Sequence, residues 1–520
     1  MKFSKSILAA SVSAVMLATI GCSSDDDPAP AGPTGNAGND TFSMVDLPLV
    51  SEWFANSGAN NDSTTTVDLT STGTPQNTFA TDVAGLNFAP TSGQIAAGFV
   101  ATTYAGAIDP AGSDWTTGWT VGLHGNDNVW EPATGGTLAG ATPTATGSCP
   151  TGTALNTTTA SEVVDGTNSM DVCDLPATIS ANTTLTNDNV YRLAAGFPGT
   201  KVGNGDAADG DDTNDSNIAL TIEPGTLILG GDGEALVITR GSTVSVNGTA
   251  VDPVVMTSYE SRPFPGVTQT NGRGEWAGFA LMGYAPTNEC GTPCDVAAEG
   301  NIGSYGGTDT ADNSGTVNYA VIKHAGNDID GLGNELNGFT LFGVGSGTTI
   351  DYVQVHKGDD DGIEHFGSAD FMSHVVLTDN ADDSFDWGQG YTGGAQFVLV
   401  KQADDDGDRG IEADNDSSNP AAAPISQPTL ANMTLMAADN SAETSADGIL
   451  LRRGTGANIY NSIITGFADA CIDIDEVATM DAAHDGSDVT TGYTGVLTID
   501  NSFVDCATDF ESGDQNLDGV

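Results

Sequence analysis

Residues 360–364 (Asp-Asp-Gly-Ile-Glu) are followed 22 residues later by a closely similar stretch, residues 382–386 (Asp-Asp-Ser-Phe-Asp). The similarity extends backwards, because residues 353–364 align with residues 375–386 without a gap. The core of the pattern is a polar residue, a small residue and an apolar residue. It begins at six positions, with intervals of 24, 22, 26, 38 and 22 residues: Asn337, Asp361, Asp383, Arg409, Asp447 and Asp469. A nearly constant period of this length predicts stacked structural units that bury their apolar faces against one another.

The fold that suits this repeat is a parallel β-helix. Around the repeat, short alternating stretches such as residues 220–228 and 242–249 are separated by glycine-containing turns, and helical periodicity is nearly absent. A leucine-rich repeat has a similar period, but its pattern of Leu and Asn is missing from this chain. We therefore predict an all-β protein, a parallel β-helix with a smaller N-terminal β-rich region, in which the longer intervals hold loop insertions.

The first 22 residues predict export. Two lysines precede a short apolar run, which is too short to span a bilayer and has the form of a signal peptide. The run ends in Thr19-Ile20-Gly21-Cys22, which resembles a bacterial lipobox and implies that Cys22 is lipidated; an ordinary secretory signal is the other interpretation. Because Ser rather than Asp follows the cysteine, the resemblance implies lipid anchoring to the outer membrane. We expect the cell surface, with the periplasmic face as the alternative.

Composition divides the rest of the chain. The segment after Cys22 is Ser, Asp, Pro, Gly and Ala without apolar periodicity, as in a flexible tether. Further on, alternating strands with aromatic turns give way to a stretch rich in Thr, Gly and Ala before the repeats begin. The expected parts are a signal peptide (1–22), a tether (23–40), a small β-rich region (41–135), a linker or extension (136–176) and the β-helix (177–520).

Six cysteines remain when Cys22 is set aside for lipid. An even number in an exported chain predicts disulfides, and their order along the chain favours three local pairs: Cys149 with Cys173, Cys290 with Cys294, and Cys471 with Cys506. Six cysteines allow 15 pairings, so other connectivities stay open. Zinc binding is the competing interpretation, but the spacings lack paired CxxC units.

Several stretches together resemble a family of secreted bacterial right-handed parallel β-helix proteins. They are residues 179–193 (ISANTTLTNDNVYRL), 222–226 (IEPGT), 276–279 (WAGF), 285–288 (APTN) and 360–364 (DDGIE). The resemblance covers roughly residues 177 to 480. It implies the right-handed form of the fold and says little about activity, because one fold hosts many functions.

The charge of the chain is strongly one-sided. It has 70 acidic and 13 basic residues, for a formal net charge of −57. This balance excludes a nucleic-acid partner, whose phosphates require clustered Lys and Arg. A surface of this kind attracts divalent cations instead.

The repeat stacks part of this negative charge. Equivalent residues in neighbouring coils of a β-helix lie about 4.8 Å apart, and two carboxylates at that distance repel by about 3.5 kcal/mol at an effective dielectric constant of 20. Crowded carboxylate oxygens suit Ca²⁺, the expected cofactor; a solvated acidic face is the alternative. The candidate ligands are Asp359, Asp360, Asp361, Glu364, Asp382, Asp383, Asp386, Asp404, Asp405, Asp406, Asp408 and Glu412.

Two classes of function remain. The first is a non-enzymatic, calcium-stabilised outer-membrane surface lipoprotein that binds a glycan, a surface or an outer-membrane protein partner, with Trp387 as a candidate ligand platform. The second is a calcium-dependent polysaccharide lyase or glycoside hydrolase that uses Lys357, His365 and Asp360, since pectate-lyase-like enzymes combine calcium ligands with a basic residue. We favour the first class, because the Asp pair recurs in at least two coils and a catalytic group is expected once.

Overall fold

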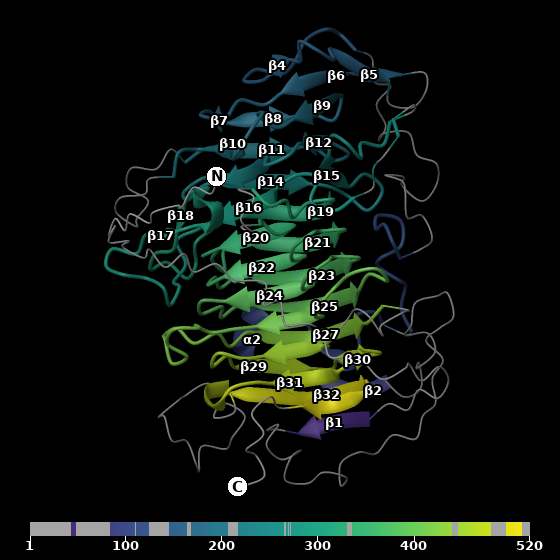
Figure 1. Ribbon diagram of the computed structural model, residues 1–520, viewed down its shortest axis with the longest axis vertical. Helices are drawn as coiled ribbons and strands as arrows, with labels where there is room; N and C mark the ends of the chain where they lie inside the picture. The colour runs from purple at the N-terminus through teal and green to yellow at the C-terminus, as the bar shows by residue number, and fades with distance from the viewer. Residues whose placement is uncertain are drawn as a thin grey trace, which may run out of the picture.

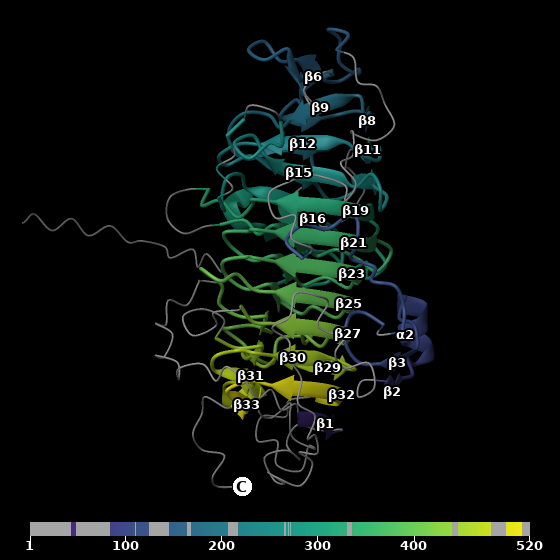
Figure 2. The same ribbon diagram turned by 90° about the vertical axis from the view of Figure 1, so that its right-hand side faces the viewer.

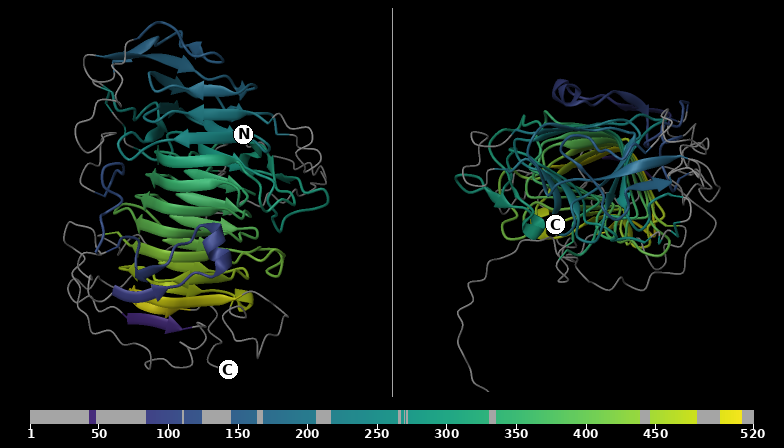
Figure 3. Two further views of the ribbon diagram at one scale, coloured as in Figure 1. Left: turned by 180° about the vertical axis from the view of Figure 1, so that it is seen from behind. Right: turned by 90° about the horizontal axis from the view of Figure 1, so that it is seen from above.

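The repeats wind into two long sheets of mainly parallel strands, stacked along the length of the molecule (Figure 1). The structure is a computed structural model that describes residues 43–47, 84–109, 111–123, 145–163, 168–205, 217–264, 267–268, 270, 272–329, 335–438, 446–479 and 496–511. Seen from above, the coils enclose a central core (Figure 3). The predicted all-β parallel β-helix is confirmed.

The first sheet has 11 strands, each hydrogen-bonded to the equivalent strand of the next coil. In stacking order they are β7 (Thr178–Ile179), β10 (Gly199–Val202), β13 (Ala235–Ile238), β16 (Gly278–Met282), β20 (Phe339–Phe342), β22 (Ile363–Phe366), β24 (Phe385–Gly388), β26 (Ile411–Ala413), β28 (Ile449–Leu451), β31 (Ala470–Ile474) and β33 (Thr508–Glu511). The repeated triplets lead directly into these strands. At Gly362 a side chain has no room, since an added Cβ would lie 2.5 Å from the Ser384 carbonyl oxygen.

The second sheet has 18 strands. They are β1 (Ser43–Leu47), β4 (Ala154–Leu155), β5 (Ser161–Val163), β6 (Ser169–Asp174), β8 (Thr183–Leu185), β9 (Asn189–Arg192), β11 (Ala219–Ile222), β12 (Leu227–Gly230), β14 (Thr243–Asn247), β15 (Val254–Ser258), β19 (Gly315–Lys323), β21 (Thr349–His356), β23 (Phe371–Thr378), β25 (Gly394–Lys401), β27 (Thr429–Met436), β29 (Ala457–Tyr460), β30 (Ile463–Thr465) and β32 (Leu497–Asp505). β17 (Val296–Ala297), η2 (Glu299–Asn301) and β18 (Ser304–Tyr305) form a side excursion. Each of the longest strands bends at a residue with positive φ, for example Tyr352 at 56°.

Interior positions of the first sheet are filled by apolar side chains in register. Ile363 pairs with Phe385, which pairs with Ile411, and all three side chains are buried in the core. Because side chains alternate across a strand, the residues between these positions point away from the core. The register therefore aligns outward-facing side chains into a ladder as strictly as it aligns the core.

The described part of the N-terminal region lies along the outer flank of the β-helix (Figure 2). It contains β2 (Ala84–Phe88), α2 (Ser92–Ala97) and β3 (Thr102–Tyr104), followed by residues 105–109 and 111–123. We call residues 99–109 and 111–123 the strap. Where it is described, the region expected at 41–135 is thus packed against the coils rather than set apart from them.

Two buried amides hold the strap. The Gln396 amide accepts from the Val100 N–H and donates to its carbonyl, both at 2.9 Å. The Gln354 amide does the same with Val121, at 2.8 and 2.6 Å. Each glutamine thereby replaces the neighbouring strand that an extended backbone normally requires.

The stretch expected as a linker at 136–176 is also part of the fold where it is described. β4 and β5 pair antiparallel with β6, and β6 pairs in parallel with β9, so these strands extend the 18-stranded sheet at one end. The signal peptide, the tether and Cys22 lie outside the described residues. Among the described helices, none is long and apolar enough to cross a membrane.

All three disulfides form as the order of the cysteines predicts: Cys149–Cys173, Cys290–Cys294 and Cys471–Cys506.

Candidate metal centre

Three consecutive coils carry acidic side chains on the outward face of the first sheet. Glu364 on β22 pairs in register with Asp386 on β24, which pairs with Glu412 on β26. We call these three residues the carboxylate ladder. Although they face away from the core, they are only 3%, 2% and 5% exposed. The ladder is therefore a set of buried carboxyl groups, in contrast to the solvated acidic face considered above.

A second row of carboxylates lies in the turns that precede these strands. One oxygen of Asp361 accepts from the Asp383 N–H at 3.0 Å, and one oxygen of Asp383 accepts from the Arg409 N–H at 2.8 Å. Each turn carboxylate thus caps the turn of the following coil. This contact explains why the triplet prefers Asp, whose short side chain reaches a nearby backbone N–H.

The two rows meet in two fully buried clusters. In each cluster, one carboxylate oxygen from every member lies within 4.8 Å of the others. The clusters are Asp361, Glu364 and Asp386, and then Asp383, Asp386 and Glu412. Two further groups, half-buried at their outer members, continue them outward: Asp360, Asp361 and Asp382, and then Asp382, Asp383 and Asp408. Asp386 belongs to both buried clusters and could bridge two ions.

The first buried cluster has unused ligand atoms. Asn337 donates its side-chain N–H to Glu364 Oε2 at 2.5 Å. Glu364 Oε1 and Asp386 Oδ1 are shielded from solvent and accept no hydrogen bond from any residue that the structure describes. A buried carboxylate oxygen without a partner is costly, so these atoms require either a proton or a cation.

The protonation states follow the same logic. Burial, reinforced by neighbouring carboxylates, raises the pKa of Asp361, Glu364 and Asp386 well above the usual range. Arg452 opposes this rise at Asp386, but burial outweighs it. At the half-buried edge, burial and the neighbouring Asp382 raise the pKa of Asp360 to about 8. Burial and mutual repulsion make the ionised form of these carboxylates unfavourable, and a bound cation would offset both effects. Such a cluster is a suitable donor set for Ca²⁺, which takes six to eight oxygen ligands.

The third rung of the ladder is neutralised within the protein. Arg452 pairs with Glu412 and places its Nε 3.0 Å from Asp414 Oδ1. Arg453 binds the other oxygen of Asp414 at 2.6 Å, and Arg409 lies 3.2 Å from Glu412. These guanidinium groups are fixed counterions for Glu412 and Asp414. The sequence alone did not identify Asn337, Arg452 or Arg453 as part of the site.

Eight of the candidate calcium ligands are brought together in these clusters, and four are not. Asp404, Asp405 and Asp406 are exposed on a loop, where Asp405 pairs with Arg273 at 2.8 Å. Asp359 is also exposed and belongs to none of the clusters found among the described residues. These four residues belong to acidic stretches of the sequence, but they do not align with the ladder in the stacked coils.

The residues of the enzymatic alternative do not converge. His365 is fully buried, stacks on Tyr391 with ring centroids 4.1 Å apart, and places Nε2 3.5 Å from Asp370. Because His365 alternates with outward-facing Glu364, its side chain points into the core. Lys357 and Asp360 lie in the connection between β21 and β22. A ligand that contacts this connection from outside cannot reach His365, which is enclosed in the core.

The expectation for Trp387 also needs correction. Its side chain is fully buried in the core, and its Nε1 donates to Thr455 Oγ1 at 3.0 Å. Trp387 follows Asp386 on β24, so an outward-facing Asp386 requires an inward-facing tryptophan. It offers no platform to a ligand.

Comparison with known families gives one result. The model of a family described as a pectate-lyase like beta helix domain matches residues 178–516, which is more than half of the chain. No curated protein and no solved structure matches the chain significantly.

Proposed function

Since the chain belongs to the pectate-lyase-like β-helix family, we propose that it is a non-enzymatic, calcium-stabilised surface protein that binds a glycan, a surface or a partner protein. In this proposal Ca²⁺ occupies the carboxylate clusters of the first sheet. The protein is a lipoprotein, anchored to the outer membrane through Cys22.

The observation that carries the calcium proposal is the buried cluster of Asp361, Glu364 and Asp386. Its oxygens lie within 4.8 Å of one another, and two of them accept no hydrogen bond from a described residue. Carboxylate oxygens favour hard cations, whereas transition metals and zinc prefer sites that include imidazole or thiolate ligands. The loops that precede the strands can adjust to a variable coordination number, which Ca²⁺ tolerates better than Mg²⁺.

Export and anchoring are supported by the sequence and by the disulfides. The six cysteines other than Cys22 all pair, as is typical of proteins that fold outside the reducing cytosol. The lipobox-like end of the signal sequence provides the anchor, and the tether that follows would hold the β-helix away from the bilayer. The negative charge argues for a cation-mediated or uncharged ligand and against nucleic acid.

The alternative is a calcium-dependent polysaccharide lyase or glycoside hydrolase. The family name favours it, and Lys357 and Asp360 remain its candidate residues. Two features favour binding instead: the acidic turns recur from coil to coil, and His365 is enclosed in the core. A structural carboxylate is expected to recur from coil to coil, whereas a catalytic centre is expected once and needs a histidine that a substrate can reach.

One experiment separates the two functions. The mature chain is screened for turnover of neutral and uronic-acid polysaccharides, with calcium and with EDTA, beside the variant Lys357→Ala. The proposal expects a melting temperature that depends on calcium and no turnover. Calcium-dependent turnover that Lys357→Ala abolishes would replace the binding function with the enzymatic one.

A further inference from the structure

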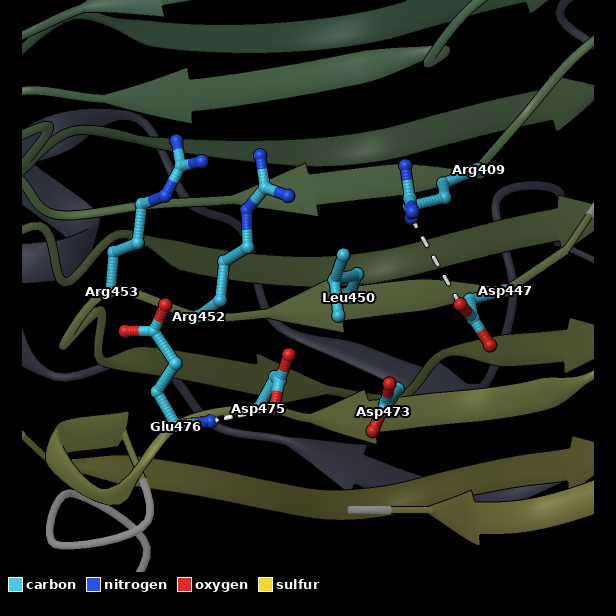
Figure 4. Close-up of a pocket in the computed structure, with 8 residues that line it drawn as sticks. All are labelled: Arg409, Asp447, Leu450, Arg452, Arg453, Asp473, Asp475 and Glu476. Atoms are coloured by element: carbon cyan, nitrogen blue, oxygen red, sulfur yellow. Dashed lines mark hydrogen bonds and ion pairs between the residues drawn. The ribbon is translucent and has the colours of Figure 1, made fainter. Parts of the chain in front are cut away.

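Basic side chains lie close together at two places on the β-helix. The first is the third rung of the ladder, where Arg409, Arg452 and Arg453 line a pocket of about 280 Å³ together with four carboxylates (Figure 4). The second is at the ends of β19 and β21 in the second sheet, and the strap lies on it. The residues of this second group are Lys323, His324, His356 and Lys357.

His356 lies directly beneath the strap. Its side chain is fully buried, and a Cβ at Gly122 of the strap would lie 2.9 Å from His356 Cε1. The Gln354 amide, which holds Val121, also donates to Thr378 Oγ1 at 2.9 Å. His356 Nδ1 lies 2.9 Å from the same oxygen. The imidazole and the strap are therefore joined by direct contact and by one hydrogen-bond network.

The other nitrogen of His356 has no partner. Nε2 is shielded from solvent and makes no hydrogen bond with a described residue. A protonated imidazole carries an N–H at both nitrogens and a full charge, so burial without an acceptor costs it far more than it costs the neutral ring. The charged ring needs water at Nε2, and the strap closes that side because it contacts the adjacent Cε1.

The cations around His356 also oppose its protonation. Lys323 pairs with it in register and is only 4% exposed, and His324 and Lys357 follow the two strands. Burial, reinforced by these three groups, lowers the pKa of His356 well below its usual value. Burial and Lys357 lower the pKa of Lys323 only to about 8, so Lys323 stays charged in acid.

Two carboxylates lie near this group, and neither forms a hydrogen bond with His356. Asp379 places Oδ2 3.9 Å from His356 Nδ1, which is beyond hydrogen-bonding distance. Glu275 lies beside Lys323, and its oxygens already accept hydrogen bonds from nearby hydroxyl and backbone groups. Residues 119–123 of the strap carry no ionisable side chain. A proton on His356 therefore creates a charge that is best stabilised by water.

We propose that proton uptake by His356 opens the C-terminal end of the strap, residues 119–123, so that the strap is an acid-sensitive cover on the second sheet. Opening lets water reach Nε2. It also uncovers Trp119, which is 3% exposed and packs on Tyr319 and Tyr352 with ring centroids 5.5 and 6.0 Å apart. Acid thus exposes an aromatic surface that is covered at neutral pH, and the switch needs neither calcium nor the carboxylate ladder.

The direction of the effect follows from the two states of the strap. The pKa of His356 is about 6.5 when water reaches the ring and is lower when the strap is closed. A base whose pKa is lowered by closure favours the closed state fully above about pH 6.5, and this preference is lost as pH falls below that value. One proton changes the opening equilibrium by up to about tenfold per pH unit.

The test is hydrogen–deuterium exchange of the calcium-loaded mature chain at about pH 7.5 and about pH 5, expressed as protection factors to remove the intrinsic effect of pH on exchange. We expect protection at residues 119–123 to fall about 10- to 30-fold in acid. Residues 99–104, which Gln396 holds, should keep their protection. His356→Gln should abolish the fall. The control His324→Asn should retain it, because His324 Nδ1 lies 2.6 Å from the Gly272 carbonyl oxygen in another loop.

Lys323→Met provides a second variant that decides the question if His356→Gln does not fold. It removes the cation next to His356, so the closed state holds a proton more easily and the fall in protection should shrink severalfold. Protection at residues 119–123 that acid leaves unchanged in the native chain would overturn the proposal. A fall as large as the native one in His356→Gln or in Lys323→Met would overturn it too.

Discussion

The first two rungs of the carboxylate ladder, Glu364 and Asp386, differ from the third, Glu412, in how the cost of a buried carboxylate is offset. Glu412 and its neighbour Asp414 are paired with Arg409, Arg452 and Arg453. At Glu364 and Asp386, no ion pair joins either carboxylate to a basic side chain among the described residues, and each keeps an oxygen without a hydrogen bond. One end of the ladder has its cations built into the sequence, and the other end has to take a proton or a cation from solution.

The comparison shows what the register of a β-helix imposes. Stacking places like charges one above another, and the cost must be offset in every coil. An arginine offsets it permanently, whereas an ion can be bound and lost. In the proposed function, a calcium-dependent element therefore lies next to one that needs no calcium for its charge balance.

The largest effect should come from removing the built-in cation. Arg452→Met leaves Glu412 and Asp414 short of a partner in a buried site, and breaking a buried ion pair costs about 3–5 kcal/mol. We expect a large drop in melting temperature in EDTA, partly recovered by calcium because Glu412 also belongs to a candidate cluster.

The control for this variant is Arg273→Met, whose partner Asp405 is exposed, so its ion pair is worth little. If Arg452→Met melts like the control, the arginines are not the counterions that the comparison requires.

Neutral isosteres should have the opposite effect at the first two rungs. Glu364→Gln or Asp386→Asn replaces a buried carboxyl group that is costly to ionise with a neutral amide, so in EDTA each variant should be as stable as the native chain or about 1–3 kcal/mol more stable. Both variants should lose the stabilisation by calcium. Thermal melts with and without calcium measure both effects.

The exposed positions Glu260→Gln and Asp232→Asn are matched controls and should behave like the native chain. A native response to calcium in Asp386→Asn would remove this residue from the site.

Acidity should stabilise the calcium-free protein. Burial raises the pKa of Asp360 to about 8 and that of Asp382 to about 6, above their values in an unfolded chain. A raised carboxyl pKa gives stability that is complete at low pH and is lost as pH rises through the folded-state value. In EDTA, the melting temperature should therefore fall between pH 5 and about 9.

Saturating calcium should reduce this fall, because the ion binds the ionised carboxylates. A melting temperature in EDTA that rises over the same interval would contradict the assignment of these groups.

The smallest and most local effect is expected at the strap, which has no part in the ladder. Gln354→Leu removes both hydrogen bonds to Val121 and leaves its backbone groups buried without partners. Amide exchange should accelerate at residues 119–123, with little change in global melting. Gln402→Leu is the control, since its buried amide bonds no described residue. Equal exchange in the two variants would show that the strap is held by other contacts.

Much of the fold could be predicted from the sequence because the repeat encodes the register. The spacing of the triplets at Asp361 and Asp383 predicts the length of one coil. The order of the cysteines predicts the three disulfides. The alternation of side chains along a strand also predicts that Trp387 and His365 face the core, which corrects their assignment as ligand-contacting residues. Each follows an acid of the ladder directly, so each had to face the core.

Other parts depend on contacts that a single sequence does not reveal. The 38-residue interval between Arg409 and Asp447 hides the fact that Leu450 and Arg452 stack on Glu412 and Asp414. The amide of Gln354 finds its backbone partner 233 residues away. Such contacts are fixed only when the coils are closed and the strap is in place.

The central claim is that calcium occupies the cluster of Asp361, Glu364 and Asp386. The most direct test is elemental analysis of the purified mature chain after exchange into calcium-free buffer, compared with Asp386→Asn. The account predicts at least one calcium ion per native chain, less or none in the variant, and a lower melting temperature when EDTA removes the ion from the native chain. No bound calcium in either protein, together with melting that is indifferent to EDTA, would contradict it.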